Sequence, residues 1–191
     1  MTNYRPITDM WLLARAKSAY YGAYPAGFLH RARALMGVKP TDAILHVCAG
    51  QVRRYPFRGF GRHDRTVDID AKTKPNYRLD VRTSLPLRHT TQRASWAHDV
   101  HLPERQLWDG VLIDRPYSEA DAAHYAHGAA VLPPLNPLLV FCLRVVPTGC
   151  LVGVLDYKWP NPRSKAREVA AVGVTTGRDA TMRVFTVWEK L

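Results

Sequence analysis

The chain has 191 residues, which is enough for one domain with a full hydrophobic core and too few for two of ordinary size. Its 27 Lys and Arg residues against 16 Asp and Glu give a formal net charge of +11, a balance that favours an anionic partner such as nucleic acid. The three cysteines, Cys48, Cys142 and Cys150, have neither disulfide nor zinc spacing, so we expect buried free thiols.

The N-terminal segment carries one short apolar patch, residues 10–13, with charged residues on either side. This patch is too short for a membrane span and lacks the pattern of a signal peptide. We therefore expect a cytoplasmic protein that does not associate with a membrane.

Five apolar runs that end in small or acidic residues predict β-strands. They are residues 43–48, 66–69, 77–81, 111–114 and 150–156. Branched apolar runs of this length are typical of parallel strands that are covered on both faces. In the fourth run, Pro116 follows shortly after Asp114 and prevents the strand from continuing.

Helical patterns alternate with these strands. Residues 27–36 place an apolar stripe on one face and stop at a glycine, and residues 118–129 begin with a serine cap. Residues 136–149 are typical of a buried helix that ends at a proline and a glycine. The alternation predicts an open α/β sheet, in which ligands bind beyond the carboxyl ends of the strands.

The C-terminal part has a different pattern. Two β-rich runs, residues 168–176 and 181–191, flank the turn residues Gly177, Arg178 and Asp179. Such a short connection is typical of a hairpin, and we expect this hairpin to close the sheet antiparallel at one edge.

The ends of the first four predicted strands carry residues suited to binding a nucleoside. Ala49 and Gly50 follow the first strand, and Asp68, Asp80 and Asp114 stand at the ends of the next three. A glycine turn lets a ligand approach the backbone, and an acid ending the second strand suits two ribose hydroxyls. An acid on the third strand can accept a hydrogen bond from an exocyclic amine. Together these positions predict an adenosine-shaped site, and the alternative for each single acid is that it merely ends a strand.

The order of these elements resembles the fold of S-adenosylmethionine-dependent methyltransferases. The tetrapeptide DRPY, residues 114–117, resembles the Asp-Pro-Pro-Tyr (DPPY) motif of DNA amino-methyltransferases. The stretches HVCAG, TVDID, RLDVRTSLP and PTGCLVGVLDYKWP are similar to that family's glycine turn, ribose-binding strand end, adenine-contacting segment and fifth strand.

This resemblance implies an α/β, single-domain class I methyltransferase (Rossmann-like) fold over residues 1–191. The sheet would be mainly parallel and seven-stranded, with a C-terminal antiparallel hairpin. The resemblance also implies S-adenosyl-L-methionine as cofactor and methylation of DNA at adenine-N6, ahead of cytosine-N4.

The same resemblance assigns roles to individual residues. Asp114 and the carbonyl of Arg115, which replaces the motif's first proline, would each accept one N–H of the target amine. Tyr117 would stack on a base flipped out of a duplex. The catalytic residues implied are Asp114, Arg115, Pro116 and Tyr117. The cofactor-binding residues implied are Tyr24, Pro25, Phe28, Cys48, Ala49, Gly50, Asp68, Ile69, Asp80, Val81 and Asp114.

The glycine turn departs from the family pattern in two ways. Val52 stands where many members have a second glycine, and residues 51–64 lack the apolar stripe of the usual first crossover helix. Gly59 and Gly61 within this stretch predict a loop instead.

Two polar segments, residues 87–107 and 158–167, are expected to form a basic rim around the site that tracks phosphates and stacks bases. The alternative is that residues 87–107 form a solvated insertion. The nucleic-acid-binding residues expected are Arg88, Arg93, Trp96, Arg105, Lys158, Trp159, Arg163 and Lys165.

Two other chemistries are disfavoured by spacing. No metal site is expected, because the histidines, among them His89, His98 and His101, have no cysteine partner and no helical pairing. Covalent cytosine-C5 chemistry is disfavoured because the chain has no Pro-Cys pair.

Three readings of function stay open. The first is a DNA amino-methyltransferase of low or short sequence specificity, because no segment is left for a target-recognition domain. It would act alone, as a homodimer or with a partner subunit, and its size and layout resemble phage or mobile-element enzymes. The second is an RNA base amino-methyltransferase. The third is a non-catalytic nucleic-acid-binding subunit of a methyltransferase complex.

Overall fold

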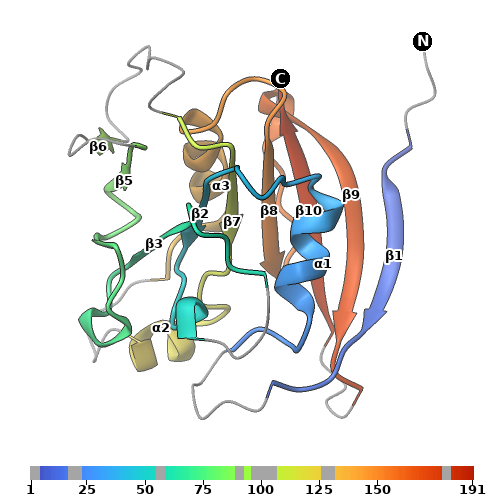
Figure 1. Ribbon diagram of the computed structural model, residues 1–191, viewed down its shortest axis with the longest axis horizontal. Helices are drawn as coiled ribbons and strands as arrows, with labels where there is room; N and C mark the ends of the chain where they lie inside the picture. Colours follow the sequence, from blue (N-terminus) through green and yellow to red (C-terminus); the bar gives the residue numbers. More distant parts are fainter. Residues whose placement is uncertain are drawn as a thin grey trace.

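One large β-sheet organises the computed structural model, which describes residues 5–16, 23–54, 59–88, 93–95, 107–125, 132–177 and 182–191 (Figure 1). The symbol η denotes a short 3-10 helix. In chain order the elements are β1 (Ile7–Leu12), α1 (Phe28–Leu35), β2 (Ile44–Val47), η1 (Val52–Arg54), β3 (Arg65–Asp68), η2 (Ala71–Thr73), β4 (Tyr77–Arg78), β5 (Ser84–Pro86), β6 (Arg93–Ser95), β7 (Gly110–Ile113), α2 (Glu119–Tyr125), α3 (Leu135–Arg144), β8 (Leu151–Asp156), η4 (Arg163–Lys165), β9 (Ala166–Thr175) and β10 (Arg183–Lys190).

The eight strands of the large sheet run in the order β1-β9-β10-β8-β7-β2-β3-β4. β10 is antiparallel to both of its neighbours, β8 and β9, and the other pairings are parallel. The five predicted parallel strands are therefore confirmed as β2, β3, β4, β7 and β8. Their carboxyl ends lie along one edge of the sheet, which we call the carboxyl edge.

The sheet differs from the prediction at its C-terminal hairpin and in having an eighth strand. The hairpin does not close an edge, because β10 lies between β8 and β9. The edge beside β9 is covered by β1 instead. The sequence of β1, ITDMWL, does not alternate apolar and polar residues, so periodicity could not reveal this strand. In the structure Trp11 is buried, whereas Ile7, Met10 and Leu12 are exposed.

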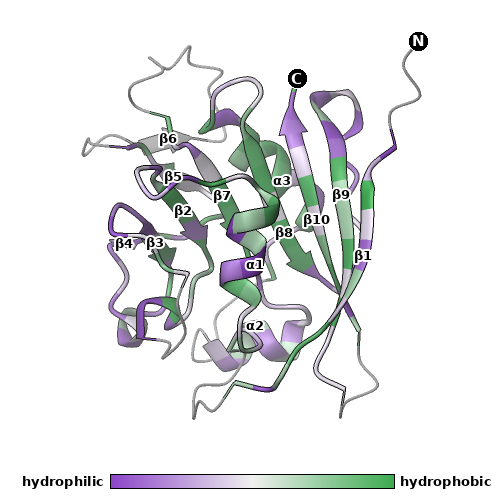
Figure 2. Cartoon of the chain, turned by 45° about the vertical axis from the view of Figure 1, so that its right-hand side comes forward, coloured by the Kyte–Doolittle hydropathy of each residue, from purple (hydrophilic) through white to green (hydrophobic). Residues whose placement is uncertain are grey.

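The helices α1 and α3 cover opposite faces of the sheet, and both were predicted. Leu138 and Phe141 of α3 share a core cluster with Leu45 of β2, whereas Phe28 of α1 shares the other cluster with Ile44. Alternate residues of β2 thus face opposite helices. Figure 2 shows the resulting apolar character of β2, β7 and β8, the strands in the middle of the sheet.

The predicted cap of α2 is confirmed. The side-chain oxygen of Ser118 accepts a hydrogen bond from the backbone amide of Asp121 at 3.1 Å, and its hydroxyl donates to the Asp121 carboxylate at 2.8 Å. A capped first turn follows directly on the DRPY tetrapeptide, so the helix begins at the carboxyl edge.

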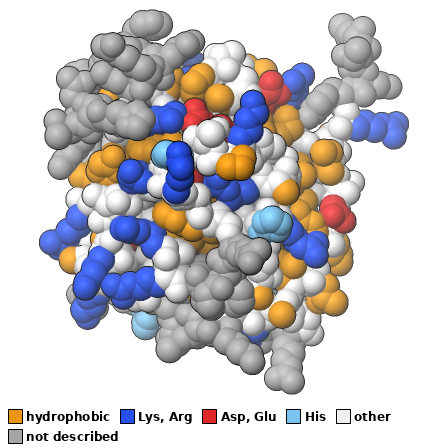
Figure 3. Space-filling view, in the orientation of Figure 1, with side chains coloured by type: hydrophobic (Ala, Val, Ile, Leu, Met, Phe, Trp, Pro, Cys, Tyr) orange, Lys and Arg blue, Asp and Glu red, His pale blue; other side chains and the backbone are white. Residues whose placement is uncertain are grey.

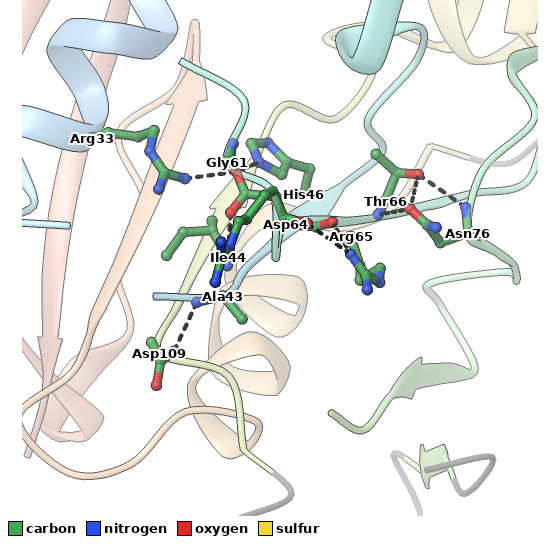
Figure 4. A network of polar contacts seen from close by, with 11 residues as sticks. Arg33, Ala43, Ile44, His46, Gly61, Asp64, Arg65, Thr66, Asn76 and Asp109 are labelled. Atoms are coloured by element: carbon green, nitrogen blue, oxygen red, sulfur yellow. Dashed lines mark hydrogen bonds and ion pairs between the residues drawn. The ribbon is translucent and has the colours of Figure 1, made fainter. Parts of the chain in front are cut away.

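The connection from β2 to β3 contains η1 and a loop in its described part, as the missing apolar stripe predicted. The loop is held by Asp64, which is 2% exposed. Its carboxylate accepts hydrogen bonds from the amides of Ile44 (3.1 Å) and Gly61 (2.8 Å) and from Arg33 Nη1 (2.6 Å), and it lies 3.0 Å from His46 Nε2 (Figure 4). A buried polar network thus ties this loop to β2 and α1.

The strand β4 is shorter than predicted and ends at Arg78. The carbonyl of Asp80 accepts the amides of Thr83 (3.0 Å) and Ser84 (3.2 Å), which turns the chain away from the sheet. The following β5 and β6 pair with each other in a separate two-stranded sheet.

Candidate functional site

Asp114 lies directly after β7, at the carboxyl edge. Its amide donates to the carbonyl of Val47 on β2 (3.2 Å), which places it beside the glycine turn. The hydroxyl of Tyr117 donates to Asp114 Oδ1, and Arg183 Nη1 donates to the Tyr117 oxygen at 3.1 Å. Because β10 runs antiparallel, its first residue, Arg183, reaches the same edge. The three side chains form a continuous polar chain across β7 and β10.

The carboxyl group of Asp114 is tuned by its surroundings. Burial raises its pKa to about 7, and the Asp156 carboxylate adds to this rise. The charge of Arg183 and the hydrogen bond from Tyr117 lower the pKa and so limit the shift. A carboxyl group with this pKa exchanges protons near neutral pH, which suits an acid–base role.

The side chain of Arg115 is buried, with 2% exposure. Its Nε lies 2.8 Å from Asp156 Oδ2 at the end of β8, and both side chains are almost fully buried. Its Nη1 donates to the carbonyls of Pro116 (3.2 Å) and Pro133 (3.1 Å). Arg115 therefore anchors the tetrapeptide to β8 through its side chain. Within the described part of the chain its carbonyl accepts no hydrogen bond, so this atom stays available to a substrate N–H.

Aromatic rings flank the tetrapeptide. Tyr157 follows β8 and packs edge-to-face against Tyr117, with 4.6 Å between the two ring centroids. Tyr157 is 47% exposed, and the guanidinium of Arg183 lies 6.0 Å from the Tyr117 ring centroid. Sequence reasoning missed both Tyr157 and Arg183. The signal for Tyr157 was its position immediately after a parallel strand, whereas Arg183 reaches the edge only because β10 is reversed.

The glycine turn after β2 has the backbone conformation that its sequence requires. Gly50 has a φ of 52°, and Cys48 takes a φ of 56°, a left-handed value that is unusual for a residue with a side chain. The Gly50 amide donates to Asp68 Oδ2 (2.8 Å), and the Asp70 amide donates to Asp68 Oδ1 (2.9 Å). Asp68 thereby joins β3 to the turn, with Ala49 buried between them.

Burial and charge link the turn to the tetrapeptide. Burial raises the pKa of Asp68, which is 8% exposed. Burial also raises the pKa of the Cys48 thiol, and the carboxylates of Asp68 and Asp114 add to this rise. Cys48 thus lies within the field of both acids, so the structure brings together the ends of β2, β3 and β7.

The segment after β4 is only partly open to a ligand. The carboxylate of Asp80 is engaged by Arg82, whose Nη2 lies 2.6 Å from Oδ2, and this hydrogen bond lowers the pKa of Asp80. Val81 is buried, while Ile69 after β3 is 39% exposed. Ile69 therefore presents an apolar surface in a region where the carboxylates of Asp68 and Asp80 already have hydrogen-bond partners.

Tyr24, Pro25 and Phe28 are buried at the start of α1. Phe28 has no exposed surface and packs against Phe185 of β10, with 5.1 Å between ring centroids. Tyr24, which is 3% exposed, packs on Phe28 at 4.9 Å. The expectation that Phe28 contacts a cofactor directly is wrong, because its ring is enclosed by core side chains.

Arg88, which was expected in the basic rim, does not lie at the carboxyl edge. Arg88 Nη1 lies 2.8 Å from Asp109 Oδ2, which also accepts the amide of Ala43 at 2.7 Å. Asp109 and Ala43 directly precede β7 and β2, so Arg88 lies at the opposite edge of the sheet. Arg93 is in β6, paired with Pro86, and Trp96 and Arg105 lie outside the described residues.

The second half of the expected rim is divided between the two edges. Lys158 follows β8 at the carboxyl edge and is exposed, whereas Arg163 and Lys165 form η4 directly before β9. Because β8 and β9 run in the same direction, β9 begins at the opposite edge. The carbonyl of Lys165 there accepts the amide of Leu191 (3.3 Å). The expectation that Arg163 and Lys165 line the site is therefore wrong.

Trp159 lies in the connection between β8 and β9, which runs from the carboxyl edge to the opposite edge. It is 56% exposed, and its Nε1 donates to Glu168 of β9 at 3.2 Å. Glu168 pairs with Trp188, near the far end of β10 from the carboxyl edge. The indole is thus directed away from Asp114, and Tyr157 is the exposed ring nearest to the tetrapeptide in this segment.

The residues that the structure describes hold no group of three or more His, Cys, Asp or Glu side chains placed to bind a metal ion. Among these same residues, no helix has the length and apolar character that crossing a membrane requires.

Comparison with solved structures finds a related fold. TrmN from Thermus thermophilus matches 91% of this chain and 51% of its own, with a TM-score of 0.56 and 14% sequence identity. The rRNA methyltransferase aviRa from Streptomyces viridochromogenes matches over 90% of this chain and 88% of its own, with a TM-score of 0.46 and 14% identity. The chain spans about half the length of the TrmN chain.

No protein-family model and no curated protein matches the sequence. The fold is nevertheless defined by its strand order and by the likeness to TrmN. It is the class I methyltransferase, Rossmann-like fold, with the reversed β10 between β8 and β9. The tetrapeptide, the glycine turn and the acid of β3 all stand at its carboxyl edge, where ligands of such folds bind.

Proposed function

We propose that this chain transfers the methyl group of S-adenosyl-L-methionine to an exocyclic amine of a nucleobase. The observation that carries the proposal is the Asp114–Tyr117–Arg183 chain of hydrogen bonds beside the glycine turn. It holds a carboxylate and an aromatic ring side by side at the carboxyl edge. A lone carboxylate that merely ended a strand would not need this support.

The proposed chemistry uses the oxygen atoms of the tetrapeptide. An exocyclic amine is a weak nucleophile because its lone pair is delocalised into the ring of the base. Asp114 and the carbonyl of Arg115 would accept its two N–H groups, which localises the lone pair and aims it at the methyl group. The methylated nitrogen must then lose a proton. Asp114, with a pKa of about 7, is suited to accept this proton near neutral pH.

The turn after β2 and the end of β3 would hold the cofactor, which supplies an electrophilic methyl group on a sulfonium. Gly50 allows a close approach to the backbone, and exposed Ile69 offers an apolar surface to a purine ring. Both oxygens of Asp68 already accept backbone amides. Each carboxylate oxygen can accept a second hydrogen bond, so Asp68 can still receive ribose hydroxyls.

Tyr117 would stack on the target base, with Tyr157 as a neighbouring ring. Stacking on an aromatic ring is worth about 1–3 kcal/mol per base, which offsets part of the cost of flipping a base out of a duplex. The DRPY resemblance places adenine-N6 of DNA first among substrates and cytosine-N4 second. An RNA base amine is the alternative. The proposed sequence specificity is low or short.

A second candidate function is a non-catalytic nucleic-acid-binding subunit of a methyltransferase complex. The observation that favours it is the pairing of Asp80 with Arg82, which occupies the carboxylate expected to bind adenine. Calorimetric titration with S-adenosyl-L-methionine separates the two candidates. Binding at micromolar to millimolar cofactor supports the enzyme, and no heat of binding supports the subunit.

The reaction itself is tested with tritiated S-adenosyl-L-methionine and unmodified DNA or RNA. After digestion to nucleosides, label is expected on N6-methyladenosine or N4-methylcytidine, in the deoxy or ribo form that identifies the polymer. Label on neither polymer would contradict the proposed enzyme.

The pH dependence of the reaction gives a sharper test of Asp114. Its carboxylate form is the hydrogen-bond acceptor, so kcat/KM is expected to rise with pH through about 7 and to level off above it. Replacing Arg183 with glutamine removes a charge that lowers this pKa, so the rise should move to higher pH. Arg167→Gln is the matched control, because Arg167 pairs with Glu189 at the opposite edge. A rise that stays in place in Arg183→Gln would contradict the assignment.

A further inference from the structure

Apart from Lys158, the exposed cations at the carboxyl edge are not the ones that the sequence singled out. Five exposed basic side chains follow the ends of β2 and β3 or lie on β4. We call them the basic strip: Arg53, Arg54, Lys72, Lys74 and Arg78. Figure 3 shows Lys and Arg side chains gathered on the side of the molecule where β3 lies in Figure 1.

The members of the basic strip lack acidic partners, in contrast to several arginines elsewhere in the described chain. Those arginines are paired, as in Arg33–Asp64, Arg88–Asp109 and Arg167–Glu189. Among the described residues, no member of the strip forms an ion pair. Positive charge without neighbouring negative charge produces a field that attracts an anion.

The acids closest to the strip in sequence are already engaged. Asp68 accepts two backbone amides, Asp70 accepts the amide of Lys72 at 2.8 Å, and Asp80 is held by Arg82. Asp80 is thus neutralised by Arg82, and among the described residues neither Asp68 nor Asp70 forms an ion pair with a member of the strip. Asp70 also caps η2, the turn from which Lys72 projects.

The strip lies in line with the tetrapeptide. Along the carboxyl edge the order is Asp114 after β7, η1 after β2, η2 after β3, and then Arg78 on β4. Neighbouring strands are about 4.8 Å apart, so the strip spans roughly 10 Å. Each strand of a duplex carries one phosphate per about 3.4 Å of helix axis, so this length corresponds to about three phosphates.

We propose that the basic strip binds the phosphodiester backbone of the nucleic acid whose base is methylated. The proposal rests on the proposed function, because a nucleobase bound at Asp114 would belong to the nucleic acid whose backbone the strip binds. Lys and Arg bind phosphate through charge and hydrogen bonds, independently of sequence. The backbone would pass outside β4, η2 and η1, beside the cofactor that the turn after β2 and the end of β3 would hold, and deliver a base at β7.

The test compares two triple variants that remove the same charge from opposite edges. The strip variant is Lys72→Gln, Lys74→Asn and Arg78→Gln. The control variant is Lys39→Gln, Arg163→Asn and Lys165→Gln. Lys74 and Arg163 both have left-handed backbones, with φ of 52° and 56°, which asparagine tolerates. All six residues are exposed, so neither variant should unfold, and thermal unfolding checks this.

Binding of short labelled single-stranded RNA and DNA of one sequence is measured by fluorescence anisotropy over a series of salt concentrations. Each lost phosphate contact lowers the slope of log affinity against log salt by about 0.7, so the strip variant should lose about 2 and bind about 10- to 100-fold more weakly. The control variant should stay much closer to the unmodified chain. The polymer that shows this difference is the one that the strip binds.

Equal losses in the two variants, or unchanged binding in the strip variant, would overturn the proposal. The outcome is separable from that of methyl transfer, because binding is measured without turnover. If the two variants bind differently but the unmodified chain transfers no methyl group, the strip is supported and the proposed reaction is contradicted. If the unmodified chain transfers methyl groups but the two variants bind alike, the reaction is supported and the role of the strip is contradicted.

Discussion

Replacing Asp114 with alanine is expected to lower the rate of methyl transfer by about 10²- to 10³-fold, the loss typical of removing one oriented electrostatic partner of a transition state. The variant loses the acceptor that polarises the amine. Affinity for S-adenosyl-L-methionine should remain largely intact, because the glycine turn is held by Asp68 and not by Asp114. Single-turnover transfer of labelled methyl groups and calorimetry measure the two effects.

Asp114→Asn serves as the companion variant, since it keeps the shape of the side chain and cannot ionise. Folding should not suffer. Asp114 has its pKa raised to about 7, so its protonated form contributes stability at low pH that is lost as the pH rises through 7. Above that pH, Asp114→Asn should be at least as stable as the unmodified chain. Transfer by either variant at a rate comparable to the unmodified chain would remove Asp114 from its proposed role.

The hydroxyl and the ring of Tyr117 can be tested separately. Tyr117→Phe removes the hydrogen bond to Asp114 and keeps the ring, so it should retain most of its nucleic-acid affinity. Tyr117→Ala also removes the stacking surface, worth about 1–3 kcal/mol per base, so it should bind the target strand about 5- to 150-fold more weakly. Equal affinities of the two variants would argue against stacking.

Replacing Asp64 with alanine is expected to cost about 3–5 kcal/mol in the free energy of unfolding, because it leaves buried cationic and amide groups without their acceptor. The groups affected are the Arg33 guanidinium, the His46 ring and the amides of Ile44 and Gly61. Urea denaturation measures the loss. The control is Glu189→Ala, which breaks a more exposed Arg–carboxylate pair and should cost about 0–1 kcal/mol.

Low pH should weaken the same network and lower the stability of the fold. Burial raises the pKa of Asp64, but the hydrogen bond from His46, the Gly61 amide and the charge of Arg33 outweigh this, so its pKa lies below the ordinary value. The resulting stability is present above the unfolded pKa of about 4 and is lost as the pH falls through the folded pKa. Asp64→Asn should flatten this acid limb of stability. An acid limb as steep as that of the unmodified chain would contradict the role of Asp64.

The sequence by itself determined the elements whose signal is local. Buried runs such as Ile44–Val47 and Gly110–Ile113 are continuous in the chain, and the Ser118 cap needs only its next three residues. The convergence of Gly50, Asp68 and Asp114 also followed from the sequence, because parallel strands share a carboxyl edge. These predictions need no knowledge of which strands are neighbours.

Only the tertiary structure decided the partners of side chains that are far apart in the chain. Arg115 meets Asp156, Tyr117 meets Arg183, and Arg88 meets Asp109 at the edge away from the site. Whether a cation after a strand reaches the site depends on the direction of the next strand. Strand order and direction arise from the packing of the whole sheet, so no single segment encodes them.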